Sequence, residues 1–210
     1  GMELARGYYD EAYADRGSMT IEYENPYILI FKGALTKADE EWFTGFMGFY
    51  FQKTRNPLVV IADGFDKTFN DLIKINKRNN ERQGIIIDIT LIAANSTKEE
   101  EVEDLATYLG ATILDKDDIG GEFEDFKFTF LSTDYDKIAK SLDFSETRYP
   151  FGSTKRAFID LNDSKFVEGL SKPEVISKRL EEISMQIDYY KSLGSKTNTE
   201  FEIYKLRKRA

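Results

Sequence analysis

The segment from residue 37 to residue 53 constrains the fold of this chain more than any other. Its centre is crowded with large apolar side chains, namely Trp42, Phe43, Phe46, Met47, Phe49, Tyr50 and Phe51. In a helix these side chains cover roughly 200° of the circumference, whereas a helix lying on a core needs an apolar stripe of only ~100° or somewhat more. Part of this surface is therefore expected to be exposed for binding. The alternative is that two neighbouring layers bury the whole helix.

The composition is that of an acidic globular protein. Its 210 residues are 41% hydrophobic and 32% charged, which is enough to bury a full core. Lys and Arg number 29 against 38 Asp and Glu, so the net charge is -9. This charge opposes phosphate backbones and anionic lipid, and we expect no nucleic-acid or membrane partner. The basic residues at 205–209 are typical of a helix C-terminus.

The chain contains no cysteine and no histidine. Disulfides, thiolate or imidazole metal sites, and the Ser-His or Cys-His arrangements of acyl-transfer enzymes are therefore excluded. No apolar run approaches the ~18–20 residues of a membrane span, and the first residues lack signal-peptide features. A cytoplasmic location is the simplest expectation. Gly1 ahead of Met2 fits either a tag remnant or the cut end of a longer protein, and both remain open.

The period of the apolar residues changes repeatedly between strand-like and helix-like spacing, which predicts a mixed α/β fold. Residues 20–23 and 27–31 flank an Asn-Pro turn, which predicts an antiparallel pair of strands. The unbroken apolar run at 58–62 is typical of a strand buried on both faces. Further strands are expected at 85–93, 111–114 and 154–161.

Helices are expected at 37–53, with Thr36 as the N-cap, and at 65–79. The spacing of Ser96 and Glu99 matches a capping box and predicts the start of a third helix.

Gly110 fits the position after the last turn of this third helix. The stretch 115–153 then combines acidic turns with closely spaced Phe residues, and no single period describes it. Within this stretch, residues 132–134 offer N-caps for a short helix that runs to about residue 142. From residue 172 onward, the spacing predicts a helical hairpin.

Two groups of carboxylates offer possible chemistry, namely Asp115, Asp117 and Asp118 after a strand, and Asp63, Asp66 and Asp71 around the second helix. The first group has ligands suited to Ca²⁺ or Mg²⁺, but its spacing is not that of an EF-hand and acidic turns are common. The second group can pair as acid and base, although Asp66 also fits a helix cap. An enzyme that uses these carboxylates with a hard metal is one alternative.

Several short motifs, taken in sequence order, resemble the apical domain of group I chaperonins, the GroEL-like ring proteins. Residues 1–8 resemble the opening Gly-Met-x-Phe-x-Arg-Gly-Tyr of that domain, and residues 24–30 its Glu-Ser-Pro-Phe-Ile-Leu-Leu. Residues 56–62 resemble its Lys-Pro-Leu-Leu-Ile-Ile-Ala, and residues 104–114 its Asp-Ile-Ala-Thr-Leu-Thr-Gly-Gly-Thr-Val-Ile. The C-terminal helical hairpin has a counterpart as well. Each motif alone is weak, but the ordered set spans nearly the whole chain.

The resemblance implies a mixed α/β apical domain over residues 1–210, with a central β-sandwich, flanking helices and a C-terminal helical hairpin. It also implies that this domain belongs to a larger ring-forming subunit. ATP and Mg would then bind to other parts of that parent protein, and this chain itself is expected to have no cofactor and no ATPase activity. Nothing in the sequence resembles the phosphate-binding loop of the family.

The family's apical domain binds non-native polypeptides, and the mobile loop of a co-chaperonin, in an apolar groove between two helices. The resemblance places the helix at 37–53 as the first groove helix. The implied polypeptide-binding residues are Tyr8, Tyr13, Phe43, Phe46, Met47, Tyr50, Ile75 and Asn76. Among these, Phe43, Phe46, Met47 and Tyr50 are expected to be exposed, while Trp42 and Phe49 are expected to pack inward. Arg6 matches a residue that contacts a neighbouring subunit in the family.

The sequence also departs from the family. Ala12 replaces a Tyr, and Asn70 and Lys74 stand at usually apolar positions of the second groove helix. The stretch 115–153 carries extra residues, so the chain is expected to be a divergent member, and some bacteriophages encode such chaperonins. A third reading is an assembly domain whose aromatic helix is an obligate subunit interface.

Overall fold

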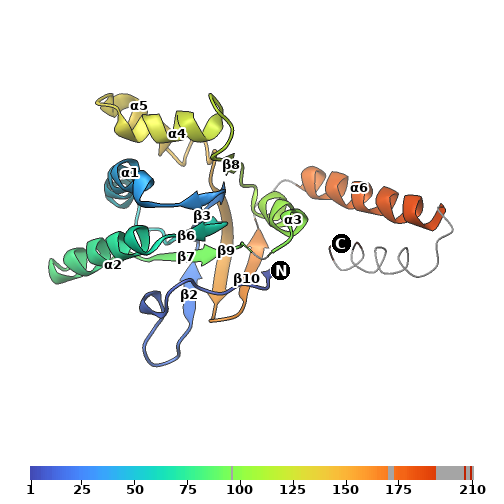
Figure 1. Cartoon of the computed structure of the whole chain (residues 1–210), viewed down its shortest axis with the longest axis horizontal. Helices are drawn as coiled ribbons and strands as arrows, with labels where there is room; N and C mark the ends of the chain where they lie inside the picture. Colours follow the sequence, from blue (N-terminus) through green and yellow to red (C-terminus); the bar gives the residue numbers. More distant parts are fainter. Residues whose placement is uncertain (96, 170–172, 193–205, 207–208, 210) are drawn as a thin grey trace.

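The computed structural model describes residues 1–95, 97–169, 173–192, 206 and 209. The strands of the main sheet are β1 (Met2–Leu4), β2 (Ile21–Glu24), β3 (Tyr27–Lys32), β5 (Leu58–Ala62), β7 (Ile89–Ala93), β8 (Ile113–Asp115), β9 (Gly152–Ile159) and β10 (Ser164–Gly169). Within the described residues they form an eight-stranded sheet in the order β1-β10-β9-β3-β5-β7, with β2 on β9 and β8 on β3 (Figure 1). A separate parallel pair consists of β4 (Ala34–Leu35) and β6 (Gly64–Phe65).

The main sheet has a parallel half and an antiparallel half, which are joined through β9. Strands β3, β5, β7 and β8 run parallel, whereas β1, β2, β9 and β10 pair antiparallel. The start of β9 pairs with β3, and the rest of β9 lies between β2 and β10. Every residue of β5 is buried, which confirms the interpretation of its unbroken apolar run.

The antiparallel pairing expected between residues 20–23 and 27–31 is wrong. Strands β2 and β3 form as expected but pair with other strands, and β9 contacts both of them. Asn25 between them has φ of 51°, and its N–H donates a hydrogen bond to the carbonyl of Lys155 at 2.8 Å. The chain therefore passes from one half of the sheet to the other at this residue. Strands β1 and β10 were not predicted.

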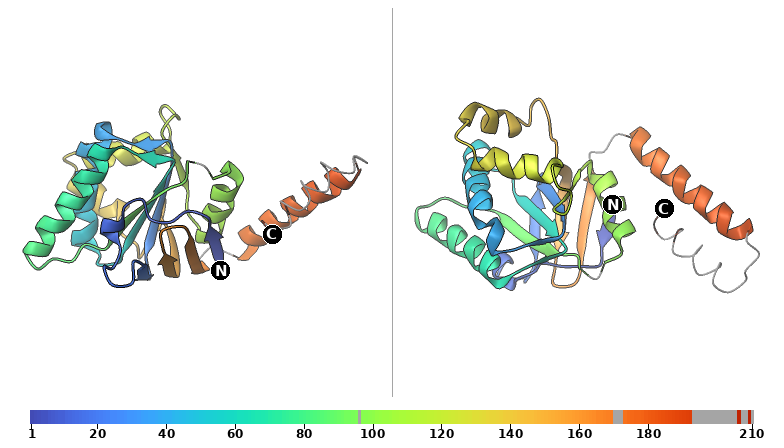
Figure 2. Two further views of the ribbon diagram at one scale, coloured as in Figure 1. Left: turned by 60° about the horizontal axis from the view of Figure 1, so that its bottom comes forward. Right: turned by 45° about the horizontal axis from the view of Figure 1, so that its top comes forward.

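The helices are α1 (Glu40–Lys53), α2 (Lys67–Arg82), α3 (Glu99–Leu109), α4 (Glu122–Leu131), α5 (Tyr135–Ser141) and α6 (Pro173–Ser192), with short 3-10 turns η1 (Glu11–Tyr13) and η2 (Lys37–Asp39). Helices α1 and α2 lie on one side of the sheet and α3 lies on the other, while α4 and α5 lie beside α1 (Figure 1). This follows from the strand order, because β8 returns to the far side of β3 and right-handed crossovers then place α3 on the opposite face. Helix α6 extends away from the sheet (Figure 2).

Several helix ends have the capping residues that the sequence predicts. The Thr36 hydroxyl accepts a hydrogen bond from the N–H of Ala38, and the Asp134 carboxylate caps α5 by accepting from the N–H of Lys137. Gly110 follows α3 in the left-handed conformation, with φ of 71°. The predicted cap Ser96 lies outside the described residues, as does the second helix of the C-terminal hairpin apart from Leu206 and Arg209.

The mixed α/β fold class is confirmed. The closely spaced Phe residues of the stretch 115–153 form helix α4. In the described part of the chain, no helix has the length and apolar character that crossing a membrane requires.

Candidate functional site

Helix α1 is covered on two sides, by the sheet and by α4. The Trp42 ring lies 6.0 Å from the ring of Phe31 on β3, measured between centroids. On the other side, the Phe46 ring lies 5.5 Å from Phe126 and 5.1 Å from Phe130 of α4. These tilted and edge-to-face arrangements are the favoured geometries of aromatic pairs. The wide apolar arc of α1 therefore belongs to the core of the domain.

This packing overturns the expected exposure of the groove residues on α1. Trp42 is buried as predicted, but so are Phe43, Phe46, Met47 and Tyr50. Their exposure was predicted from the width of the apolar arc and from the resemblance to a groove helix, and the second layer that covers the arc comes from a distant part of the sequence. With all its aromatic rings except that of Phe49 buried in the domain, α1 presents little apolar surface to a neighbouring subunit.

The solvent side of α1 carries small or polar residues, namely Glu41, Thr44, Gly48 and Gln52. A Cβ atom added at Gly45 would lie 3.0 Å from the carbonyl oxygen of Phe130, so glycine allows α4 to approach closely there. Phe49 was expected to face inward but is partly exposed, and its ring lies 6.0 Å from the ring of Tyr135.

The two predicted binding tyrosines of the N-terminal segment are also buried. The Tyr8 hydroxyl donates a hydrogen bond to the carbonyl of Met19 at 3.1 Å, and the Tyr13 hydroxyl donates to Oδ1 of Asn70 at 2.7 Å. The amide of Asn70 in turn donates to Oδ2 of Asp10 at 2.8 Å. Asn70 therefore fastens the N-terminal segment to α2.

Lys74 completes this polar network, with its Nζ 2.9 Å from Oδ2 of Asp10. Burial alone would raise the pKa of the Asp10 carboxyl, but hydrogen bonds from Ala12, Lys74 and Asn70 outweigh it and hold that pKa below its ordinary value. The hydrogen bond to Asp10 raises the pKa of Lys74, and burial raises the pKa of Tyr13. Asn70 and Lys74, which the resemblance places at usually apolar groove positions, thus have hydrogen-bonding partners within the chain.

The outer surface of the helical layer exposes other apolar side chains. Ile75 of α2 is 51% exposed, and Asn76 beside it is partly exposed. On α4 and α5, the exposed fractions are 54% for Phe128, 39% for Leu131 and 66% for Tyr135. Phe128 lies opposite the buried face of α4, because it is rotated by about 200° from Phe126 at 100° per residue. Of the predicted polypeptide-binding residues, Ile75 is the most exposed.

The carboxylates considered as metal or acid-base sites form helix caps, turn hydrogen bonds and ion pairs within the chain. Asp66 caps α2 by accepting a hydrogen bond from the N–H of Phe69, and Asp63 accepts one from the N–H of Gly33. Asp71 pairs with Lys67 and Lys74. The Asp115 carboxylate accepts from the N–H of Asp117 within its turn. Among the residues that the structure describes, no cluster of three or more acidic side chains is placed to hold a metal ion.

A buried ion pair fixes the start of α1. Nζ of Lys116 lies 2.6 Å from Oδ2 of Asp39 and donates to the carbonyl of Ala34 at 2.5 Å. The other carboxylate oxygen of Asp39 accepts a hydrogen bond from the indole N–H of Trp42 at 2.9 Å. Lys116 follows β8 and Ala34 follows β3, so the pair fills the space beyond the carboxyl ends of these two strands, where doubly wound folds often bind ligands.

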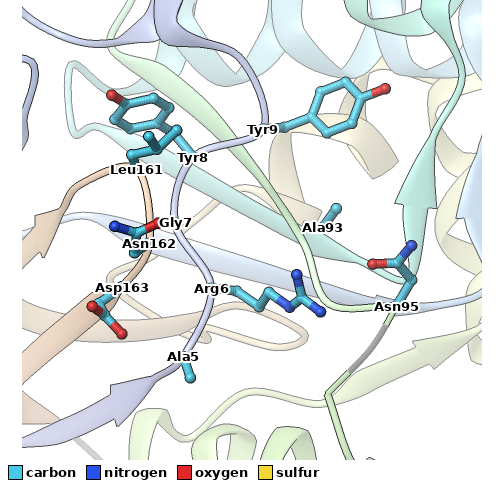
Figure 3. Close-up of a pocket in the computed structure, with 10 residues that line it drawn as sticks. All are labelled: Ala5, Arg6, Gly7, Tyr8, Tyr9, Ala93, Asn95, Leu161, Asn162 and Asp163. Carbon is cyan, nitrogen blue, oxygen red and sulfur yellow. The ribbon is translucent and has the colours of Figure 1, made fainter.

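Arg6 lines a polar cavity of about 500 Å³ on another part of the surface (Figure 3). The cavity lies between the N-terminal segment, the end of β7 and the turn that joins β9 to β10, and its lining residues are Ala5, Arg6, Gly7, Tyr8, Tyr9, Ala93, Asn95, Leu161, Asn162 and Asp163. Among the described residues, no hydrogen bond or ion pair involves the Arg6 guanidinium. The sequence singled out Arg6 but not the cavity.

The fold is similar to that of a chaperonin. No protein-family model matches the chain. The chain superposes on the crystal structure of the chaperonin gp146 from the bacteriophage EL 2 (Pseudomonas aeruginosa), determined in the presence of ATP-BeFx, with a TM-score of 0.59 and 13% sequence identity. The match covers 98% of this chain and 36% of the chaperonin chain, so the chain spans about a third of that protein's length. At this identity the likeness establishes a chaperonin-like fold.

Proposed function

We propose that this chain is the polypeptide-binding domain of a chaperonin-like ring subunit, and that it binds non-native proteins. The observation that carries the proposal is the match of 98% of the chain to part of a phage chaperonin. The ordered motifs of the apical domain support it independently of the structure. In this proposal ATP and Mg act in other parts of the parent protein, and this chain binds its clients without a cofactor.

The proposed contact surface is the outer side of the helical layer. Non-native chains offer apolar segments, and burying apolar area stabilises a complex by about 25 cal/mol per Å² without a specific sequence. The exposed apolar residues that we assign to this contact are Ile75, Phe128, Leu131 and Tyr135, which take the place of the buried residues of α1. Three of these four residues come from α4 and α5, within the stretch that is longer than in the family.

Two further roles follow from the resemblance to group I chaperonins and belong to the same proposal. The subunits assemble into a ring homo-oligomer. A co-chaperonin, if the parent protein uses one, binds to the same outer surface as the client chains.

The proposal is tested by measuring how well the chain suppresses the aggregation of a chemically denatured model protein. We expect suppression by the parent chain and its loss in the double variant Phe128→Glu/Tyr135→Glu. The matched control is Phe158→Glu on β9, since Phe158 is an exposed aromatic residue of the antiparallel half of the sheet. Circular dichroism and urea melts establish that all variants fold.

Three results would contradict the proposal in different ways. Absence of suppression by the folded parent chain would overturn the polypeptide-binding function itself. Suppression that survives in the double variant would place the binding surface elsewhere on the domain. If suppression is lost equally in the double variant and in Phe158→Glu, any exposed aromatic residue contributes to binding, and the outer side of the helical layer is not a specific contact surface.

A further inference from the structure

The cavity around Arg6 has a rigid frame. The N–H of Tyr8 donates to the carbonyl of Asp160 at 3.0 Å, and the N–H of Tyr9 donates to the carbonyl of Leu91 at 2.7 Å. A Cβ atom at Gly7 would lie 1.9 Å from the carbonyl oxygen of Asp160, so only glycine permits this approach of the two segments. The N-terminal segment is therefore held on both sides, and the cavity exists before any ligand arrives.

Arg6 is the cationic residue of this cavity, and its guanidinium has no partner among the described residues. Its side chain is partly buried and extends toward Asn95 (Figure 3). Arg209, by contrast, contacts both carboxylate oxygens of Asp104, at 2.5 and 2.9 Å. A guanidinium has donors in a planar fork that fits a carboxylate with two parallel hydrogen bonds. The free fork of Arg6 thus has the geometry for an anion that enters from outside.

The other groups of the cavity restrict the kind of anion. Asp163 is the acidic residue of the lining, and its side chain points away from Arg6 (Figure 3). One cation and one nearby anion suit a ligand with a single negative charge better than a phosphate dianion. Asn95 adds an amide that both donates and accepts hydrogen bonds, as a peptide group requires.

An apolar wall adjoins these polar groups. Tyr9 and Ala93 lie on the same side of the N-terminal segment as Arg6 and Asn95 in Figure 3. The Tyr9 ring is 41% exposed, although its hydroxyl donates to the carbonyl of Phe65 and so fixes the position of the ring. A fixed and exposed aromatic ring is a surface on which an apolar side chain can be buried.

From these contacts we infer that the cavity binds the free C-terminal carboxylate of a polypeptide whose last residue is apolar. Arg6 holds the carboxylate, Asn95 contacts the last peptide group, and the last side chain lies on Tyr9 and Ala93. This inference rests on the proposed polypeptide-binding function and adds a second contact, on a surface separate from Phe128 and Tyr135, that recognises chain ends.

The probe is a short acetylated peptide that ends in leucine, titrated into the chain by calorimetry as the free acid and as the C-terminal amide. We expect the free acid to bind about ten- to a hundredfold more tightly than the amide, the range for hydrogen bonds to a charged group. Arg6→Gln should lose this preference, and Asp163→Asn should bind the free acid more tightly because one negative charge is removed. The matched control is Arg156→Gln, because Arg156 is an exposed arginine of β9.

A third peptide separates the two possible sources of a carboxylate. It has an amidated terminus and carries one Glu side chain. If it binds as tightly as the free acid, the cavity recognises any carboxylate and the assignment to chain ends is overturned. Equal binding of acid and amide, or an unchanged preference in Arg6→Gln, would overturn the role of Arg6. If these peptides fail while the suppression of aggregation persists, the cavity assignment is wrong and the proposed function stands.

Discussion

The two helices that the sequence placed at a binding groove, α1 and α2, differ in how many neighbours cover them. Helix α1 packs between the sheet and α4, and all its aromatic residues except Phe49 are buried. Helix α2 buries Phe69 and Ile73 on one side and leaves Ile75 exposed on the other. The width of an apolar arc therefore reports how many layers a helix contacts. It does not by itself report how much apolar surface remains in water.

The largest expected effect tests the burial of α1. Phe46→Ala should lower the free energy of unfolding by about 3–5 kcal/mol, because it leaves a cavity among the rings of α1 and α4. Urea melts measure this change, and Ile75→Ala on α2 is the matched control, with an expected loss below about 1 kcal/mol. Equal and small losses at both positions would break the comparison, since α1 would then be no better covered than α2.

The next effect concerns the ion pair that fixes the start of α1. Lys116→Met should cost about 3 kcal/mol, because the buried Asp39 carboxylate loses its counter-charge. The double variant Lys116→Met/Asp39→Asn should recover part of that loss, since no unpaired charge then remains. If the single variant melts at the same urea concentration as the parent, the pair contributes nothing to the position of α1.

The polar network on α2 predicts a dependence on pH. The pKa of Asp10 is lowered in the folded chain, so its stabilising effect is complete above the ordinary carboxyl pKa and is lost as the pH falls through the folded value. At pH 7, Asp10→Asn should be less stable than the parent by about 1–2 kcal/mol. Near pH 2 the two melting curves should converge, and a difference that stays constant from pH 7 to pH 2 would contradict this assignment.

A smaller effect is expected for the residues that define the outer surface. Phe128→Ala and Tyr135→Ala should each change the free energy of unfolding by less than about 1 kcal/mol, because both side chains are already largely in water. Thermal melts of the single variants measure this. A large loss of stability at either position would show that this side chain belongs to the core and not to the contact surface. The contrast between the buried and the exposed helix faces would then be weaker.

The smallest effect is expected at Arg6. Arg6→Ala should alter stability by at most ~0.5 kcal/mol, since the guanidinium contacts no partner among the described residues. A denaturant midpoint well below that of the parent chain would instead reveal an internal partner for Arg6. Tyr8→Phe is the comparison variant in the same N-terminal segment. It removes the hydrogen bond to the carbonyl of Met19 and should lower the free energy of unfolding by about 1 kcal/mol.

The sequence by itself determined the features that depend on neighbouring residues. The mixed α/β order, the cap at Thr36, the left-handed Gly110 and the buried run of β5 all follow from local periodicity and turn chemistry. These features need no knowledge of distant partners, because the backbone of a helix cap or turn is satisfied by residues a few positions away.

Tertiary structure alone decided which surfaces remain in water. The sequence shows the apolar arc of α1, but the rings that cover it, Phe126 and Phe130, lie in α4, far along the chain. Tyr13 is buried because it meets Asn70, and β2 pairs with β9 instead of the nearby β3. Periodicity states how much apolar surface an element must bury, whereas contacts between distant elements determine what buries it. For the same reason, the cavity at Arg6 is visible only in the folded chain, where three separate segments meet.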